Sequence, residues 1–265
     1  MFVDSHCHLT LPELHGRIDA IRADMAAARV DRALVICTTL EEFADVHALA
    51  LRYDNFWASA GVHPDNEDVE EPTVERLTAL AAMPKVVGIG ETGLDYYRLG
   101  ARTLDQMEWQ RERFRVHIRT ARQVRKPLIV HTRSASDDTL AILREEGAEQ
   151  AGGVFHCFTE TMAVARAALD LGFMVSFSGI VTFRNAEDLR EVARFVPLER
   201  CLIETDSPYL APVPHRGKVN NPSFVPHVAA AVAQLKGLPV EEVAQATSAN
   251  FERLFGVPAV SASAV

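Results

Sequence analysis

The sequence has few cysteines, no long apolar segment and no excess of positive charge. Its four cysteines are widely spaced among 265 residues and form no CxxC pair. We therefore expect small core residues in a reducing compartment rather than a disulfide framework. Because no stretch of about 18 apolar residues is present, the sequence predicts no membrane span. The first residues contain no basic segment before an apolar run, so we expect a cytoplasmic protein.

Acidic residues outnumber basic ones, 36 to 27, which gives a net charge of −9. This balance argues against a protein that binds nucleic acid or anionic lipid through bulk charge. It leaves room for a nucleic-acid enzyme whose contacts are local or carried by metal ions. With 48% apolar and 24% charged residues, the composition also excludes a mainly disordered chain.

Short apolar runs alternate with amphipathic stretches along the whole chain. The runs span 1–7, 33–39, 56–62, 86–90, 127–131, 153–158, 173–180 and 201–204. Their starts are about 28 residues apart, which is close to the length of a βα repeat. Helical periodicity is clearest in 104–121 and recurs in 163–171, 186–195 and 225–235. This pattern predicts an α/β fold, a single-domain (β/α)₈ TIM barrel over 1–258 with a flexible C-terminal tail at 259–265. The alternative is an open doubly wound sheet.

Six side chains of metal-binding type lie at the C-terminal ends of these runs. They are His6, His8, Glu91, His131, His156 and Asp206. In a parallel barrel those ends share one rim, where barrel active sites lie. Four histidines and two carboxylates exceed what one tetrahedral zinc ion needs, so we expect two divalent ions. The donor set suits zinc, manganese or iron and also allows magnesium with additional waters.

Other polar residues on the same rim are candidates for supporting roles. His63 ends the third run and is a candidate substrate contact, or alternatively a capping residue. Glu204 shares strand parity with Asp206, and we expect it to orient a ligand histidine. The cations on rim loops can bind phosphate oxygens or be ordinary surface charges; they are Arg133, Arg216 and Lys218.

Several motifs together resemble the TatD-type deoxyribonucleases, a family of amidohydrolase-like metal-dependent hydrolases. The motifs are DSHCHL at 4–9, GVHP at 61–64, GIGETGLDYY at 88–97, PLIVHTR at 127–133, FHCF at 155–158, TFRNA at 182–186, ETDSPYLAP at 204–212, HRGK at 215–218 and NFERLF at 250–255. They follow the family order over nearly the whole chain. One departure is Glu160, which stands where a small turn residue is usual and bears on substrate preference.

The resemblance implies how the ligands are shared between two ions. One ion would be held by His6, His8, Glu91 and Asp206. The second would be held by Glu91, His131 and His156, so that Glu91 bridges the two.

The resemblance also implies hydrolysis of a phosphodiester by attack of a metal-activated hydroxide, with Asp206 as a proton acceptor. The predicted activity is that of a deoxyribonuclease, a 3′–5′ exonuclease on single-stranded DNA. One alternative is a metal-dependent hydrolase of a small-molecule ester or amide, and another is a catalytically silent barrel that acts as a scaffold. The native metal, the physiological substrate and the oligomeric state stay open at the level of sequence.

Overall fold

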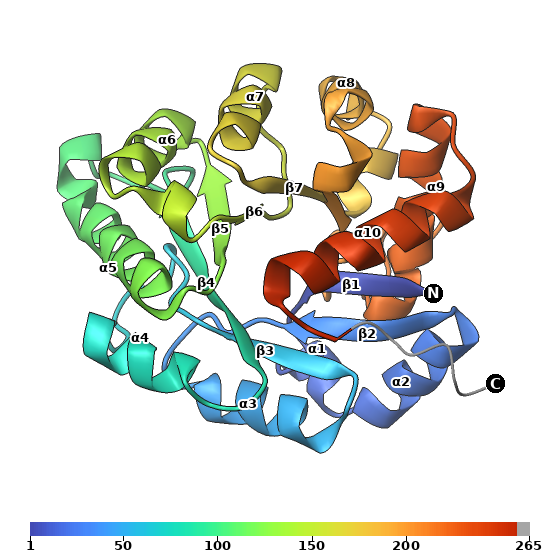
Figure 1. Cartoon of the computed structure of the whole chain (residues 1–265), viewed down its shortest axis with the longest axis horizontal. Helices are drawn as coiled ribbons and strands as arrows, with labels where there is room; N and C mark the ends of the chain where they lie inside the picture. The colour runs from blue at the N-terminus through green and yellow to red at the C-terminus, as the bar shows by residue number, and fades with distance from the viewer. Residues whose placement is uncertain (259–265) are drawn as a thin grey trace.

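Eight parallel strands form one sheet in the order β1 to β8, with helices around the outside (Figure 1). This computed structural model describes residues 1–258, and the tail predicted at 259–265 lies outside the described residues. The strands are β1 (Phe2–Cys7), β2 (Val30–Val35), β3 (Phe56–Ala60), β4 (Val86–Asp95), β5 (Leu128–Arg133), β6 (Gly153–Phe155), β7 (Met174–Phe177) and β8 (Cys201–Ile203). The fold is the predicted single-domain (β/α)₈ barrel, nearly closed.

The barrel closes where β1 meets the end of β8. Cys7 and Ser207 form an isolated parallel bridge. The His8 amide donates to the Ser207 carbonyl at 2.8 Å, and the Asp206 amide donates to the His6 carbonyl at 3.0 Å. Two segments about 200 residues apart in sequence are therefore held side by side at the rim.

The helices follow the strands in regular alternation. The α-helices are α1 (Pro12–His15), α2 (Ile18–Ala27), α3 (Phe43–Arg52), α4 (Val74–Ala81), α5 (Glu108–Val124), α6 (Ser136–Glu145), α7 (Met162–Asp170), α8 (Glu187–Phe195), α9 (Val225–Lys236) and α10 (Val240–Phe255). The 3₁₀ segments are η1 (Leu104–Met107), η2 (Ala148–Gln150), η3 (Gly179–Thr182), η4 (Leu198–Arg200) and η5 (Pro222–Phe224). Side-chain caps define some starts: the hydroxyl of Thr161 accepts from the Val164 amide at the start of α7.

The structure corrects several predicted boundaries. The helix expected over 104–121 is divided into η1 and α5, because Thr103 and Gln106 form a capping box that begins a separate turn. β4 continues to Asp95, five residues beyond the predicted end, because it pairs with β5 on both sides of an irregularity between Ile89 and Thr92. Glu91 therefore lies inside a strand, at its irregular point, rather than at the strand's end.

Two apolar cores lie on the two faces of the sheet. Alternate residues of β2 and its continuation divide between them: Leu34 and Ile36 belong to the inner cluster, and Ala33 and Val35 to the outer one. Phe251 and Phe255 of α10 belong to the inner cluster, and Figure 1 shows α10 across one end of the barrel. Apolar side chains thus close that end.

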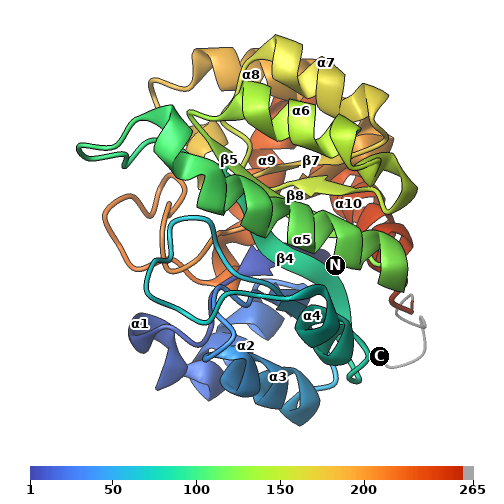
Figure 2. The same ribbon diagram turned by 90° about the vertical axis from the view of Figure 1, so that its left-hand side faces the viewer.

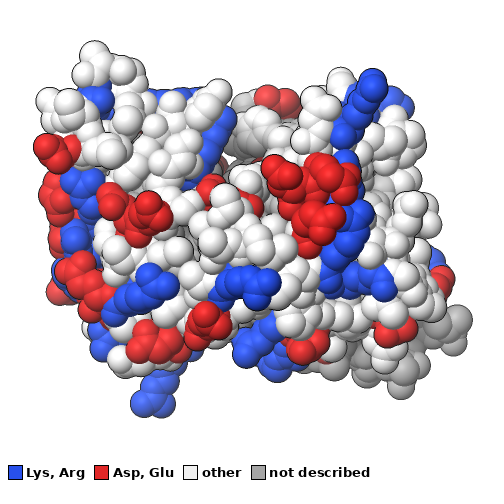
Figure 3. All heavy atoms as spheres, turned by 90° about the horizontal axis from the view of Figure 1, so that it is seen from above, with Lys and Arg blue, Asp and Glu red and all other residues white. Residues whose placement is uncertain are grey.

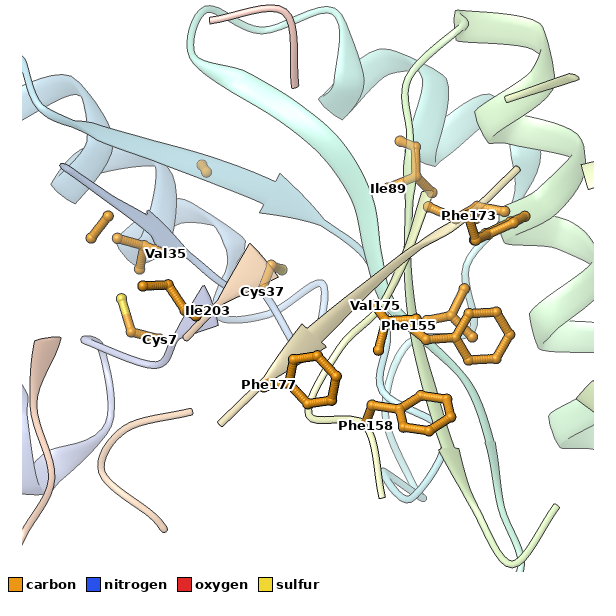
Figure 4. Packing of buried hydrophobic residues seen from close by; sticks show 14 of the residues in the cluster. Cys7, Val35, Cys37, Ile89, Phe155, Phe158, Phe173, Val175, Phe177 and Ile203 are labelled. Carbon is orange, nitrogen blue, oxygen red and sulfur yellow. The ribbon is translucent and has the colours of Figure 1, made fainter. Parts of the chain in front are cut away.

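The outer core packs the sheet against the helices (Figure 4). Phe155 on β6 lies edge to face with Phe173, with ring centroids 5.6 Å apart. Burying a phenylalanine of this kind contributes about 1.5–3 kcal/mol. This packing fixes the strand ends on which the polar rim is built.

The long loops after β3, β4 and β8 extend from one end of the barrel (Figure 2). Acidic and basic side chains are interspersed on the surface seen from above (Figure 3), so this face carries no large patch of one sign. Within residues 1–258, no helix is long and apolar enough to span a bilayer.

Candidate metal centre

The six predicted ligands meet at the C-terminal end of the strands. His6 and His8 alternate along β1 and its continuation, and their Nε2 atoms lie 3.2 Å apart. The Oδ1 atom of Asp206, which follows β8, lies 3.6 Å from His6 Nε2 and 3.2 Å from His8 Nε2. Because β1 and the end of β8 are paired at this point, the three groups form one side of the site.

Glu91 lies between the two halves of the cluster. Its Oε2 atom is 3.2 Å from His6 Nε2 and 3.7 Å from His8 Nε2. Its Oε1 atom is 3.2 Å from His131 Nδ1 and 2.8 Å from His156 Nε2. The two oxygens of one carboxylate therefore face two different pairs of imidazoles, which is the arrangement of a bridging ligand.

Carboxylates behind the histidines orient two of the rings. The Nδ1 atom of His156 lies 3.3 Å from Glu204 Oε1, and the Nε2 atom of His131 lies 3.1 Å from Asp95 Oδ2. At these positions the ring N–H donates a hydrogen bond to the carboxylate, so the opposite nitrogen of each neutral ring carries a free lone pair. In both rings that nitrogen points at Glu91, as a metal ligand requires.

His63 has the opposite arrangement. Its Nδ1 atom accepts from the Asp65 amide at 3.0 Å, so the neutral ring carries its proton on Nε2. That nitrogen lies 3.3 Å from Glu91 Oε1. The geometry favours a hydrogen bond from His63 to Glu91 or to a bound substrate over direct ligation of a metal.

The surrounding histidines determine the charge state of the central carboxylates. Burial alone would raise the pKa of Glu91, but His156, His63 and His6 hold it well below its usual value. Burial likewise opposes ionisation of Asp206, and contact with His8 outweighs it, so the pKa of Asp206 is lowered. Both carboxylates are therefore anionic near neutral pH.

The chemistry of this donor set fits divalent cations. Glu91 Oε2 and His156 Nε2 are buried, and although His6 and Glu91 atoms lie 3.2 and 2.8 Å from them, neither atom makes a well-aligned hydrogen bond within residues 1–258. Buried polar atoms without partners are costly unless another group satisfies them. Three sets of ligand atoms each lie within 4.8 Å of one another; they are His6, His156 and Asp206; His6, His8 and Glu91; and His63, Glu91 and His131. Imidazole and carboxylate donors in this arrangement suit zinc or manganese.

Two buried acids of this region, Asp4 and Asp95, have no role predicted from the sequence. Asp95 faces His131, and Asp4 accepts hydrogen bonds from the Thr205 amide at 2.9 Å and the His6 amide at 3.3 Å. Burial raises the pKa of Asp4 to about 8. Asp95 is four residues beyond Glu91 and therefore on the same strand face, but the predicted strand ended before it.

A pocket with a volume of about 730 Å³ opens above the cluster. His63 and Arg133, two of the predicted substrate contacts, line it. Arg133 has no carboxylate within 4 Å among residues 1–258, and its guanidinium lies 3.6 Å from the centroid of the Tyr97 ring. Arg216 and Lys218 do not line this pocket; Arg216 lies over the ring of Phe183, and Lys218 borders a separate surface depression.

Comparison with known proteins agrees with this geometry. The family profile described as TatD related DNase matches residues 3–256. The chain is 53% identical to the metal-dependent hydrolase YcfH of Escherichia coli, over 97% of this chain and 96% of that protein. It is 36% identical to a protein of Citrobacter rodentium named 3′-5′ ssDNA/RNA exonuclease TatD, over 98% and 99% of the two chains.

A solved structure supports the same assignment. The crystal structure of YjjV, a TatD homologue from Escherichia coli, superimposes with a TM-score of 0.87 at 31% identity, over 97% of this chain and 98% of that one. The family match, the relatives and the cluster of six ligand-type side chains on one barrel rim agree, and this chain belongs to the TatD family of metal-dependent hydrolases.

Proposed function

We propose that this protein hydrolyses phosphodiester bonds in single-stranded DNA as a 3′–5′ exonuclease that uses two divalent ions. The ions would be zinc, manganese or magnesium. One would be held by His6, His8, Glu91 and Asp206, and the other by Glu91, His131 and His156. A cytoplasmic location belongs to the same proposal.

The observation that carries the proposal is the position of Glu91. Its Oε2 atom faces His6 at 3.2 Å, while its Oε1 atom faces His156 at 2.8 Å and His131 at 3.2 Å. A carboxylate that serves only one ion does not need imidazole nitrogens around both of its oxygens. Paired ions are suited to phosphodiester hydrolysis because they act on both the attacking and the leaving oxygen.

The protein's own residues supply positioning and proton transfer. When bound, divalent ions lower the pKa of water and neutralise charge that develops on a phosphoryl group. Asp206 is anionic and partly open to the pocket, with 14% of its side chain exposed, so its carboxylate can accept a proton from the attacking water. Glu204 and Asp95 hold the rings of His156 and His131 in the tautomer that directs a lone pair to the centre.

Charge at the pocket supports a phosphate-containing substrate. Arg133 lines the pocket without a carboxylate partner in the described chain and is therefore free to bind a phosphate oxygen. The net charge of −9 fits local contacts of this kind better than a long electrostatic track. Contacts of Arg216 and Lys218 with more distant nucleotides stay predictions. The name of the Citrobacter rodentium relative gives the substrate class and the polarity that we propose.

The experiment compares wild type, Glu91→Ala and the matched control Glu191→Ala, in which an exposed acid of α8 is removed. Each protein is treated with chelator and then supplied with manganese, magnesium or zinc. The substrates are single-stranded, duplex and abasic DNA together with small phosphoesters. We expect wild type and the control to degrade single-stranded DNA only with metal, and Glu91→Ala to be inactive while its circular dichroism is unchanged.

Two results would contradict the proposal. Hydrolysis that resists chelator, or that persists in Glu91→Ala at the wild-type rate, would exclude the bridged two-ion centre. Turnover of a small ester with no cleavage of any DNA would leave the metal centre in place and assign a different substrate.

A further inference from the structure

The pocket above Glu91 has an apolar wall on one side of the barrel and a charged wall on the other. Its apolar side comes from the loops after β7, β8 and β1, which are consecutive in the barrel. We call this the apolar wall; its residues are Leu11, Ile180, Tyr209 and Leu210. Across the pocket, the loop after β4 and the end of β5 contribute Arg98 and Arg133. Arg98 is paired with Asp65 at 3.1 Å, whereas Arg133 has no such ion pair in the described chain. A ligand in this pocket therefore meets apolar surface on one side and the guanidinium of Arg133 on the other.

The loops of the apolar wall are packed closely together. A side-chain carbon added at Gly179 would lie 2.0 Å from the carbonyl oxygen of Leu210, so only glycine allows this approach. The amide of Val213 donates to the hydroxyl of Thr182 at 2.9 Å, which joins the same two loops a second time. The loops after β7 and β8, which carry Ile180, Tyr209 and Leu210, are thus held together.

Tyr209 is held firmly through its backbone, and its ring is left open. Its amide donates to the Asp206 carbonyl at 3.1 Å, and its carbonyl accepts from the side chain of the buried Asn220 at 2.6 Å. The residue is nevertheless 54% exposed, and its ring centroid lies 6.5 Å from that of His8. The backbone that carries this aromatic ring is therefore fixed at the mouth of the site, while the ring itself is not part of the core.

The other tyrosines do not offer a free face in this way. Tyr53 and Tyr96 are each 7% exposed, and the Tyr96 hydroxyl donates to Asp138 at 2.7 Å. Tyr97 is exposed, but the guanidinium of Arg133 covers its ring at 3.6 Å. Within residues 1–258, no cation covers the Tyr209 ring.

We propose that Tyr209 is the platform on which a nucleobase next to the scissile phosphate stacks, while Arg133 binds a backbone phosphate across the pocket. This inference rests on the proposed function and adds the group that recognises the base. Every base has a π-face, so stacking on a tyrosine tolerates all four bases. Tyr209 acts in binding, and it takes no part in the chemical step.

Calorimetry tests the proposal without requiring turnover. Thymidine 5′-monophosphate and base-free 2-deoxyribose 5-phosphate are titrated into manganese-loaded wild type, Tyr209→Ala and Tyr209→Phe. Leu51→Ala, which truncates an exposed residue of α3, is the matched control. We expect Tyr209→Ala to weaken nucleotide binding about tenfold and to leave binding of the sugar phosphate unchanged. Tyr209→Phe keeps the ring and should bind both ligands as wild type does.

Equal affinity of wild type and Tyr209→Ala for the nucleotide would overturn the proposal. An equal loss for both ligands would also overturn it, because it would mean that the substitution disturbed the metal or phosphate site. Metal content and thermal midpoint, measured on each variant, show whether the fold is intact.

A cleavage assay distinguishes a failure of this inference from a failure of the proposed nuclease function. Single-stranded oligonucleotides are prepared with normal or base-free nucleotides on both sides of the terminal phosphodiester. Tyr209→Ala should raise KM about tenfold on the normal substrate and leave KM on the base-free one unchanged. If wild type cleaves neither oligonucleotide, the nuclease function is wrong, and the calorimetric result alone decides whether Tyr209 recognises a base.

Discussion

Acidification should destabilise this protein through one buried histidine outside the metal centre. His117 on α5 is fully buried, its Nε2 atom accepts from the Val62 amide at 3.0 Å, and its Nδ1–H donates to the Arg113 carbonyl at 2.8 Å. Both ring nitrogens are thus used by the neutral form. Burial lowers the pKa of His117 from 6.5 to about 4.

The sign of the effect follows from proton binding. Below pH 6.5 the unfolded chain protonates this histidine and the folded protein does not, so folding stability falls as the pH decreases toward 4. Between pH 7.5 and 5, protonation linked to His117 lowers the free energy of unfolding by about 2 kcal/mol. It is absent above pH 7.5, where both states are neutral.

Urea unfolding at several pH values measures this contribution. Wild type and His117→Gln are compared with chelator present, and His15→Gln serves as the control for an exposed histidine. His117→Gln should be less stable at pH 7.5, but the gap to wild type should narrow by about 2 kcal/mol at pH 5. Parallel stability curves for wild type and His117→Gln would refute the reasoning.

Three further outcomes are expected. In the proposed two-ion centre, Asp95→Asn should lower the affinity for the ion beside His131 about 10- to 100-fold, because the Nε2–H of His131 loses its carboxylate partner. Unchanged metal affinity in a competition titration would contradict this prediction. Gly93→Ala should lower the free energy of unfolding, measured in urea, by about 3 kcal/mol or more. The reason is that Gly93 has a φ of 137° and an added side-chain carbon would lie 1.9 Å from the His131 carbonyl oxygen. A decrease below about 0.5 kcal/mol would contradict this packing. Removing metal present at 100 times its Kd should lower the free energy of unfolding by about 2.7 kcal/mol, and a thermal midpoint unaffected by chelator would argue against a bound ion.

Periodicity predicted the barrel because its strands are covered on both faces. Eight apolar runs with helical stretches between them correspond to the eight observed strands, including the β2 segment, whose residues alternate between the two cores. Boundaries were less well predicted. β4 continues past Glu91 through pairing with Val130 and His131 on β5, which is a tertiary contact that local sequence does not encode.

The meeting of the six candidate ligands at one rim could be predicted because each stands next to an apolar run. The residues behind the candidate ligands were harder to identify. The strand parity of Glu204 predicted a place beside a histidine, and its carboxylate lies 3.3 Å from His156 Nδ1. Asp95 was missed because the predicted strand was too short. The positions of the candidate substrate-binding residues depend on loop conformation, which the sequence pattern does not predict. Tyr209 is placed by the hydrogen bond from Asn220 to its carbonyl, which joins residues 11 positions apart within an irregular loop.

Anomalous diffraction from crystals grown with manganese tests the central claim most directly. We expect two manganese peaks, one on the Oε2 side of Glu91 beside His6 and His8, and the other on its Oε1 side beside His131 and His156. A single peak would remove the bridging role of Glu91. No peak within the cluster, with the imidazoles turned away from one another, would contradict the metal centre itself.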